Sequence, residues 1–177
     1  YAQPYNYTAD ASHLGIPVLL MTPGPDDLPS RAAARQVFDQ IIKDLQDAEQ
    51  LFGERFMTDA YHASKESVWA LLSRVYLYKE DWENAILYST RVIDRMPLAH
   101  GDEYLEMYHN LVPGKEAILR FNGLLKSKSL NSFYSSNEPV AMAADSLLSL
   151  FTDPEDIRLQ LFAPDKNNEL RISTKYR

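Results

Sequence analysis

The chain has 177 residues, of which 45% are hydrophobic, and this share is enough to build a core and excludes wholesale disorder. Lys and Arg number 18 against 25 Asp and Glu, so the formal net charge is -7 and no nucleic-acid partner is expected. The absence of cysteine excludes disulfides, thiol nucleophiles and thiolate metal sites, and no apolar run approaches the roughly 20 residues that span a bilayer.

The first 29 residues are predicted to be a loop, because prolines and glycines interrupt them repeatedly. Within them the apolar run Gly15–Met21 is compatible with a buried extended segment, but its periodicity does not decide this. The chain starts without a Met and without the basic and apolar parts of a signal peptide. We therefore expect it to be a piece of a longer protein.

A long amphipathic helix is predicted next, with Ser30 as its N-cap and Gly53 as its C-terminal cap. Its apolar residues recur at spacings of three and four, which places them on one face. They are Ala34, Val37, Phe38, Ile41, Ile42, Leu45, Ala48, Leu51 and Phe52.

Two shorter helices follow the loop over residues 54–63. Ser64 is the expected cap of a helix from Lys65 to about Lys79, and Asp81 caps another that Pro97 ends. The first is apolar on more than one side, which is typical of a helix between neighbours. The second is predicted to bury one stripe, made of Trp82, Ala85, Ile86, Ser89, Val92, Ile93 and Met96.

This pair of helices fits the tetratricopeptide pattern, a helical hairpin of about 34 residues. Trp69, Leu72 and Tyr76 stand at its large positions, Ala85 at the small position where the helices cross, and Pro97 at its end. A small residue at the crossing lets two antiparallel helices approach closely. Only one repeat fits, and a single repeat cannot bury its own core, so we expect other helices to cover it.

The rest of the chain is predicted to alternate short elements with loops. We expect a short helix over Asp102–His109 and a strand or extended segment over Gly114–Phe121. Another helix is expected over Ala141–Phe151. Residues 122–140 are polar and predict a loop, and Asp153 is the expected cap of a last helix.

These elements predict a mainly α fold with tetratricopeptide-like helical hairpins and long irregular loops. We expect a single domain, or a fragment of a longer one, over residues 1–177. Its parts are a loop-rich segment (1–29), a helical region (30–99) and a mixed region of loops and helices (100–177).

The sequence offers little for catalysis or metal binding. The histidines lack the spacing of three or four that makes a metal site on a helix, and no nucleophile motif or phosphate loop is present. Adjacent acidic residues do not face each other on a helix, so caps and solvated faces explain them better than acid–base chemistry. These acidic pairs are Asp26–Asp27, Glu80–Asp81 and Glu155–Asp156. We therefore predict no enzyme, no cofactor and no metal site.

Two groups of aromatic residues are candidates for ligand contact. Those of the hairpin are expected mostly in its core, and they are Trp69, Tyr76, Tyr78, Trp82 and Tyr88. The other group lies in the polar loop, where Phe133 and Tyr134 are flanked by Asn131 and Asn137. Such a group can place a ring on the apolar face of a sugar and amides on its hydroxyls. These four residues are the predicted ligand site; a loop whose rings are tucked onto the domain is an equally open interpretation.

Several segments in a fixed order resemble the SusD/RagB family of outer-membrane lipoproteins of Bacteroidetes. They are GIPVLL, SRAAARQVFDQIIKDLQDAEQLF, SKESVWALLSRVYLYKEDWENAILYSTRVID, GKEAILRF, AADSLLSLFTDPEDIRLQLF and TKYR. The resemblance implies a mostly helical, lipid-anchored binding protein on the cell surface. Such a protein delivers oligosaccharides, or in some members peptides, to a TonB-dependent transporter of the SusC type, with the hairpin as scaffold and docking element.

The lipidated cysteine of the family has no counterpart here, so the resemblance places any lipid anchor outside this chain. A second hypothesis stays open: a soluble tetratricopeptide adaptor that binds a protein or peptide segment in a helical groove.

Overall fold

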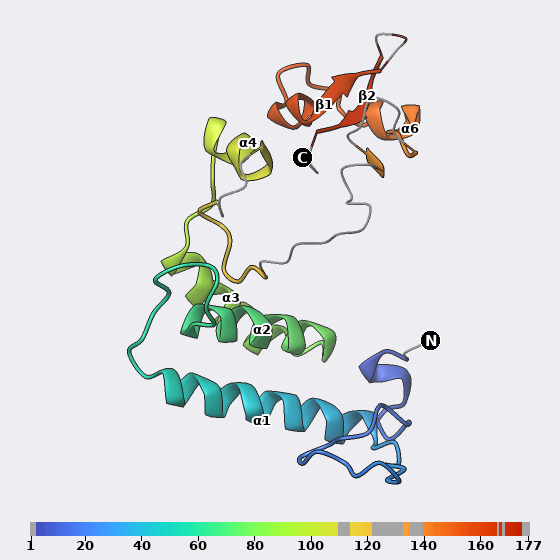
Figure 1. Cartoon of the computed structure of the whole chain (residues 1–177), viewed down its shortest axis with the longest axis vertical. Helices are drawn as coiled ribbons and strands as arrows, with labels where there is room; N and C mark the ends of the chain where they lie inside the picture. Colours follow the sequence, from blue (N-terminus) through green and yellow to red (C-terminus); the bar gives the residue numbers. More distant parts are fainter. Residues whose placement is uncertain are drawn as a thin grey trace. The chain divides into compact units, whose positions relative to one another are not determined.

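The computed structural model describes residues 3–109, 114–121, 133–134, 140–165, 167 and 169–174. The described part is mainly helical, as the sequence predicts (Figure 1). It forms two compact units, Tyr1–Met96 and Pro97–Arg177.

The N-terminal segment is held against the start of the first long helix. After a short 3₁₀ helix, η1 (Tyr5–Tyr7), an isolated antiparallel bridge joins Leu14 to Ala33. The N–H of Gly15 donates to the carbonyl of Ala32 at 2.8 Å. The run Gly15–Met21 forms no helix or strand, and most of its large apolar side chains are exposed. It is therefore a surface segment of this unit, not part of its core.

Helix α1 (Ala34–Phe52) begins later than predicted. Its N-cap is Ala33, and the side chain of Gln36 accepts a hydrogen bond from the Ala33 N–H at 3.1 Å. Ser30 is not the cap, because the residues just before α1 are extended in the bridge to Leu14. The end is as predicted: Gly53 has φ +55°, in the left-handed region that favours glycine.

Helices α2 (Lys65–Tyr78) and α3 (Trp82–Arg95) form the predicted hairpin. The Ser64 hydroxyl accepts from the N–H of Ser67 at 3.3 Å, and the Asp81 carboxylate accepts from the N–H of Asn84 at 3.2 Å. Both predicted caps are thus confirmed.

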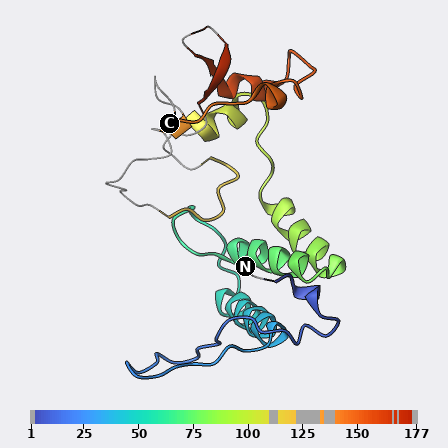
Figure 2. The ribbon, with the colours of Figure 1, turned by 90° about the vertical axis from the view of Figure 1, so that its right-hand side faces the viewer.

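The core of the hairpin contains the residues of the tetratricopeptide pattern. Trp69, Leu72, Tyr76 and Ala85 are all buried, and Leu72 is 0% exposed. At the crossing, the Ser73 hydroxyl donates to the carbonyl oxygen of Ala85 at 3.1 Å. Helix α1 lies beside the hairpin in both Figure 1 and Figure 2. Four of its partly buried side chains pack against the core of the hairpin. They are Ile42, Leu45, Ala48 and Phe52.

The stripe predicted for α3 is wrong for three of its residues. Trp82, Ile86 and Ile93 are 58%, 64% and 60% exposed, whereas Tyr88 is buried beside Ala85. The rings of Tyr88 and Tyr76 stack at 5.7 Å, so α3 turns this face inward. Both sets of residues fit the helical period, and the close crossing at Ala85 decides between them.

The aromatic residues of the hairpin divide in the same way. Trp69, Tyr76 and Tyr88 are in the core, as expected, but Tyr78 and Trp82 are exposed.

The second unit begins with helix α4 (Asp102–His109), which matches the prediction. Residues 114–121 form turns and irregular chain, and the predicted strand is not present. Helix α6 (Asp145–Leu148) is much shorter than the predicted helix over residues 141–151. The Ala141 N–H donates to the carbonyl oxygen of Phe133 at 3.0 Å, which ties the start of that segment to another part of the chain.

The end of the chain differs most from the prediction. The last helix is a 3₁₀ helix, η2 (Ile157–Leu161), and its cap is Asp156, not Asp153. Two strands then pair antiparallel, β1 (Phe162–Pro164) and β2 (Leu170–Ser173). These strands were not predicted from the sequence, because three or four residues are too few to show the alternating pattern of a strand.

Candidate functional site

The predicted ligand site is described only at its two aromatic residues. Phe133 and Tyr134 lie in a helical turn with ring centroids 6.4 Å apart and ring planes tilted by 46°. Phe133 is 42% exposed and Tyr134 is half-buried. The hydrogen bond from Ala141 to the Phe133 carbonyl oxygen anchors the turn. Asn131 and Asn137 lie outside the described residues, so the four-residue site remains a prediction.

The geometry of the two rings suits an apolar ligand face. A partly exposed ring beside a half-buried one offers a surface on which a sugar ring or an apolar side chain can rest. Such a surface binds and orients a ligand but carries no acid, base or nucleophile.

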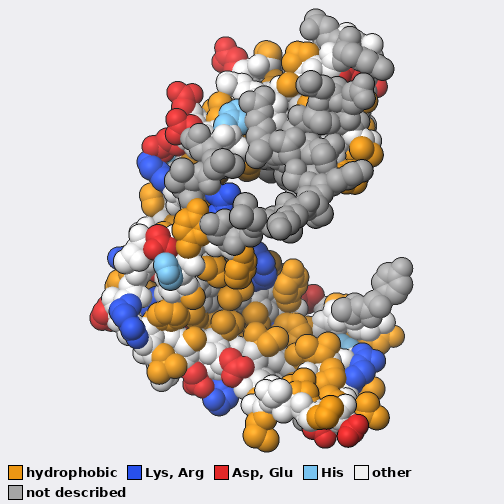
Figure 3. Space-filling model, viewed as in Figure 1, with side chains coloured by type: hydrophobic (Ala, Val, Ile, Leu, Met, Phe, Trp, Pro, Cys, Tyr) orange, Lys and Arg blue, Asp and Glu red, His pale blue; other side chains and the backbone are white. Residues whose placement is uncertain are grey.

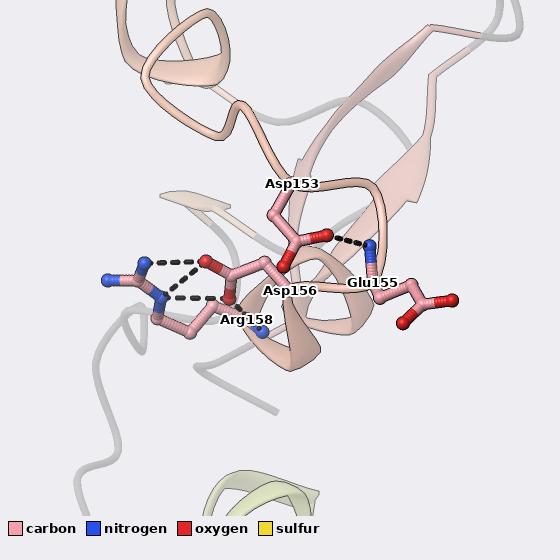
Figure 4. Close-up of polar contacts among 4 residues, drawn as sticks. All are labelled: Asp153, Glu155, Asp156 and Arg158. Atoms are coloured by element: carbon pink, nitrogen blue, oxygen red, sulfur yellow. Dashed lines mark hydrogen bonds and ion pairs between the residues drawn. The ribbon is translucent and has the colours of Figure 1, made fainter.

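The acidic pair at residues 155–156 belongs to a turn (Figure 4). Arg158 donates from Nε to Asp156 Oδ1 at 2.9 Å and from Nη2 to Asp156 Oδ2 at 2.5 Å. These bonds hold the pKa of Asp156 at about 2. Asp153 accepts from the N–H of Glu155 at 2.9 Å. A carboxylate kept ionised in this way stabilises the turn and does not serve as a proton donor near neutral pH.

The other two acidic pairs also have structural partners. Asp27 accepts from the N–H of Gly24 at 2.6 Å, closing a turn. Asp81 caps α3, and Glu80 accepts from the side-chain amide of Asn6 at 2.6 Å. The predicted cap is thus confirmed at Asp81, and Asp27 closes a turn.

Three of the histidines have a hydrogen-bond partner in the described structure. Thr8, Asp59 and Thr174 contact His13, His62 and His109, respectively. The hydrogen bond from His62 lowers the pKa of Asp59 below its usual value. Across the described ranges, no three His, Cys, Asp or Glu side chains form a group that could hold a metal ion.

One buried and one partly buried carboxylate of the first unit were not predicted from the sequence. Glu66 is 2% exposed, accepts from the N–H of Met57 at 2.9 Å and lies 3.5 Å from the guanidinium of Arg95. Glu66 therefore links the loop before α2 to the end of α3. Its signal in the sequence is weak, because an acidic residue in the first turn of a helix is ordinarily explained by the helix dipole.

Glu49 of α1 makes a second link between the helices. It accepts from the indole N–H of Trp69 at 2.7 Å and from Arg91 at 3.0 Å. One carboxylate thereby joins α1, α2 and α3. These contacts tie the hairpin to α1.

Two open pockets lie along the N-terminal segment, with volumes of about 520 and 480 Å³. The smaller is lined mainly by apolar side chains, among them Leu14, Val37 and Phe38. Its Arg31 guanidinium donates to the carbonyl oxygens of Leu14 and Gly15 at 2.6 Å. The arginine thus fixes the backbone of the segment. In the part of the chain that the structure describes, no helix is both long and apolar enough to cross a membrane.

The comparisons with known proteins agree with this fold. Residues 1–77 match the model of a SusD-like family whose description reads "Starch-binding associating with outer membrane". A search of curated proteins found no significant match.

Solved structures match nearly the whole chain. A SusD superfamily protein from Bacteroides thetaiotaomicron has a TM-score of 0.79 and 24% identity, over 97% of this chain and 42% of its own. A SusD-like carbohydrate binding protein from Bacteroides vulgatus has a TM-score of 0.75 and 19% identity, over 100% of this chain and 41% of its own. The chain therefore spans about two fifths of the length of these relatives.

Proposed function

We propose that this chain is part of a SusD-like protein that captures oligosaccharides for import and is not an enzyme. The observation that carries the proposal is the match of residues 1–77 to a family described as starch-binding. The fold supports it, since the likeness to SusD superfamily structures extends over nearly the whole chain. The positions of the acidic pairs in caps and turns are in keeping with a binding role.

The proposed ligand site is the loop with Asn131, Phe133, Tyr134 and Asn137. The rings of Phe133 and Tyr134 would contact the apolar face of a sugar, and the two amides would bind its hydroxyl groups. Oligosaccharides are the proposed ligands, and peptides are the alternative that the same rings would accommodate.

The proposed partner is a TonB-dependent transporter of the SusC type in the outer membrane. The protein would be exposed on the cell surface and held there by a lipid anchor outside this chain. The family description, which names association with the outer membrane, supports this location.

The outer face of the hairpin is the proposed docking surface for the transporter. Hydrophobic side chains, orange in Figure 3, gather over the helices of the first unit. The exposed hydrophobic residues of the hairpin, including those of α3 that lie behind α2 in this view, are Leu77, Tyr78, Trp82, Ile86 and Ile93, among others. Exposed apolar side chains in such number are typical of protein contact surfaces. The links through the partly buried Glu49 and the buried Glu66 would keep this surface rigid.

Titration calorimetry tests the ligand site. The chain is titrated with maltooligosaccharides, other oligosaccharides and short peptides, and then the Phe133→Ala and Tyr134→Ala variants are compared. A stacked ring contributes about 0.5–1.5 kcal/mol, so each variant should bind about 2- to 12-fold more weakly.

The matched control is Phe121→Ala, which removes another highly exposed ring from the same unit and should not change the affinity. Unchanged affinity in both loop variants would reject the site. Failure of the chain to bind any oligosaccharide would reject the function.

Copurification with a SusC-type barrel tests the docking surface. Trp82→Ala combined with Ile86→Ser should reduce the recovered complex, whereas Leu51→Ser, on an exposed position of α1, should not. Equal recovery of wild type, the double variant and Leu51→Ser would rule out this face as the docking surface. Binding of these helices to a soluble protein segment, and not to the barrel, would favour the tetratricopeptide adaptor.

A further inference from the structure

A small pocket in the second unit lies apart, in sequence, from the predicted loop site. Its volume is about 240 Å³, and it is formed where the start of α4 packs against η2. The lining residues are Ala99, His100, Gly101, Tyr104, Ile157 and Arg158. Pockets for drug-sized ligands are typically about 300–1,000 Å³, so this one has room for a single ring-sized molecule.

The walls of the pocket are fixed by backbone contacts. Ala99 is buried, and its N–H donates to the Glu116 carboxylate at 2.7 Å. Gly101 has φ +57°, a turn that favours glycine, and its carbonyl oxygen accepts from the N–H of Tyr104 at 3.1 Å. Leu105 of α4 is buried. The pocket is therefore formed before any ligand arrives.

Most of the charged groups around the pocket are paired. Arg158 is paired with Asp156 through Nε and Nη2, as Figure 4 shows, so this corner has no net charge. Asp102 and Glu103 lie in the first turn of α4, next to the lining residues. Glu103 is itself paired with Lys115, so these groups favour neither an anionic nor a cationic ligand. A neutral ligand fits best.

The lining groups match a hydroxylated ring. Tyr104 and Ile157 provide apolar wall, while His100 and Arg158 carry nitrogen atoms that can bind hydroxyl groups. Among the described contacts of Arg158, the bonds to Asp156 use Nε and Nη2 but not Nη1. An aromatic wall beside a guanidinium held by a carboxylate can bind the apolar and polar sides of one sugar ring at once.

We propose that this pocket is a second carbohydrate subsite that takes one neutral sugar ring, with Tyr104 as its aromatic wall and Arg158 as its hydrogen-bond donor. The preference for a neutral hydroxylated ring follows from the pocket itself. The choice of a sugar among such molecules rests on the proposed function. The subsite would add affinity for ligands without using the loop at residues 131–137.

Nuclear magnetic resonance of the full chain tests the proposal, with D-glucose, D-galactose, D-mannose and D-glucuronate as probes. At least one neutral sugar should cause saturable shifts of the Gly101 and Arg158 amide signals, with a dissociation constant on the order of 1–10 mM. D-glucuronate should bind at least about tenfold more weakly.

Three variants locate the binding. Ile157→Trp, which fills the pocket, should abolish the shifts, and His100→Ala, on an exposed position that tolerates change, should weaken them about threefold or more. Phe133→Ala should leave them unchanged. If Ile157→Trp does not fold, the size of the shifts in His100→Ala still tests whether the sugar binds in this pocket.

The subsite is refuted if no neutral sugar shifts Gly101 and Arg158, or if the shifts persist undiminished in His100→Ala. Its failure is distinguishable from failure of the proposed function. Oligosaccharide binding that is weakened by Phe133→Ala, without any shift at Gly101, refutes only the subsite, whereas the absence of all glycan binding refutes both.

Discussion

Between Ala34 and Arg95, three helices of 14 to 19 residues pack through buried stripes and are joined by long-range side-chain contacts. From Pro97 onward, the described elements have three to eight residues, and contacts within a few residues, such as that of Asp156 with Arg158, shape the chain. This difference supports our proposal that the first unit is a scaffold. The second unit is built from turns that can present side chains to a ligand.

The largest expected effect comes from the core of the scaffold. Leu72→Ala should lower the free energy of unfolding by about 2–5 kcal/mol, because Leu72 is fully buried between the helices and a cavity would remain. Leu77→Ala, on the same helix but half exposed, should change it by less than about 1 kcal/mol. Urea unfolding followed by circular dichroism measures both. Equal losses would mean that α2 does not bury the face described here.

The next effect tests the helix crossing. Ala85→Leu should overpack the contact between α2 and α3 and lower the free energy of unfolding by about 1–3 kcal/mol. Glu83→Leu places the same side chain on the exposed side of α3 and serves as the control. A melting temperature of Ala85→Leu at or above that of wild type would show that the helices do not approach closely at this position.

A smaller effect separates two serines that the sequence analysis treated alike. Ser64→Ala removes the cap of α2 and should cost about 1 kcal/mol, whereas Ser30→Ala should have an effect within about 0.5 kcal/mol because Ser30 caps no helix. Thermal unfolding of the two variants provides the comparison. A loss in Ser30→Ala as large as that in Ser64→Ala would place the start of α1 at Ser30 after all.

The smallest effect concerns the second unit and depends on pH. The pKa of Asp156 is lowered to about 2 by Arg158, so the ion pair stabilises the folded state fully above the unfolded pKa of about 3.9. This stabilisation is lost as the pH falls through about 2. The stability difference between wild type and Asp156→Asn should therefore be constant near neutral pH and shrink between about pH 4 and pH 2.

Urea unfolding at a series of pH values measures this difference, with Asp94→Asn on the exposed side of α3 as a control for general charge effects. A difference that grows as the pH falls would contradict the ion pair. Such a result would show that this short-range contact does not stabilise the second unit.

The scaffold could largely be predicted from the sequence, because its signals are local and redundant. Ser64, Asp81 and Gly53 mark helix ends by their chemistry, and the spacing of Trp69 and Leu72 marks a hairpin. The rotation of α3 could not be predicted, because two sets of apolar residues fit the same period and only the packing at the crossing selects one.

The second unit was harder to predict for a different reason. Its strands are too short for a pattern, and Asp153 and Asp156 are equally good caps until the turn closed by the Glu155 N–H is known. The pocket beside Tyr104 combines residues more than 50 positions apart, which no local pattern links. For the predicted loop site, the structure places Phe133 and Tyr134 side by side, and the roles of Asn131 and Asn137 remain predictions.

Hydrogen exchange of the full chain, measured by mass spectrometry with and without a saturating oligosaccharide, tests most directly whether one unit is the scaffold and the other binds the ligand. The account predicts slower exchange in peptides from Pro97–Arg177 and unchanged exchange across α1, α2 and α3. Slower exchange confined to those three helices would contradict it.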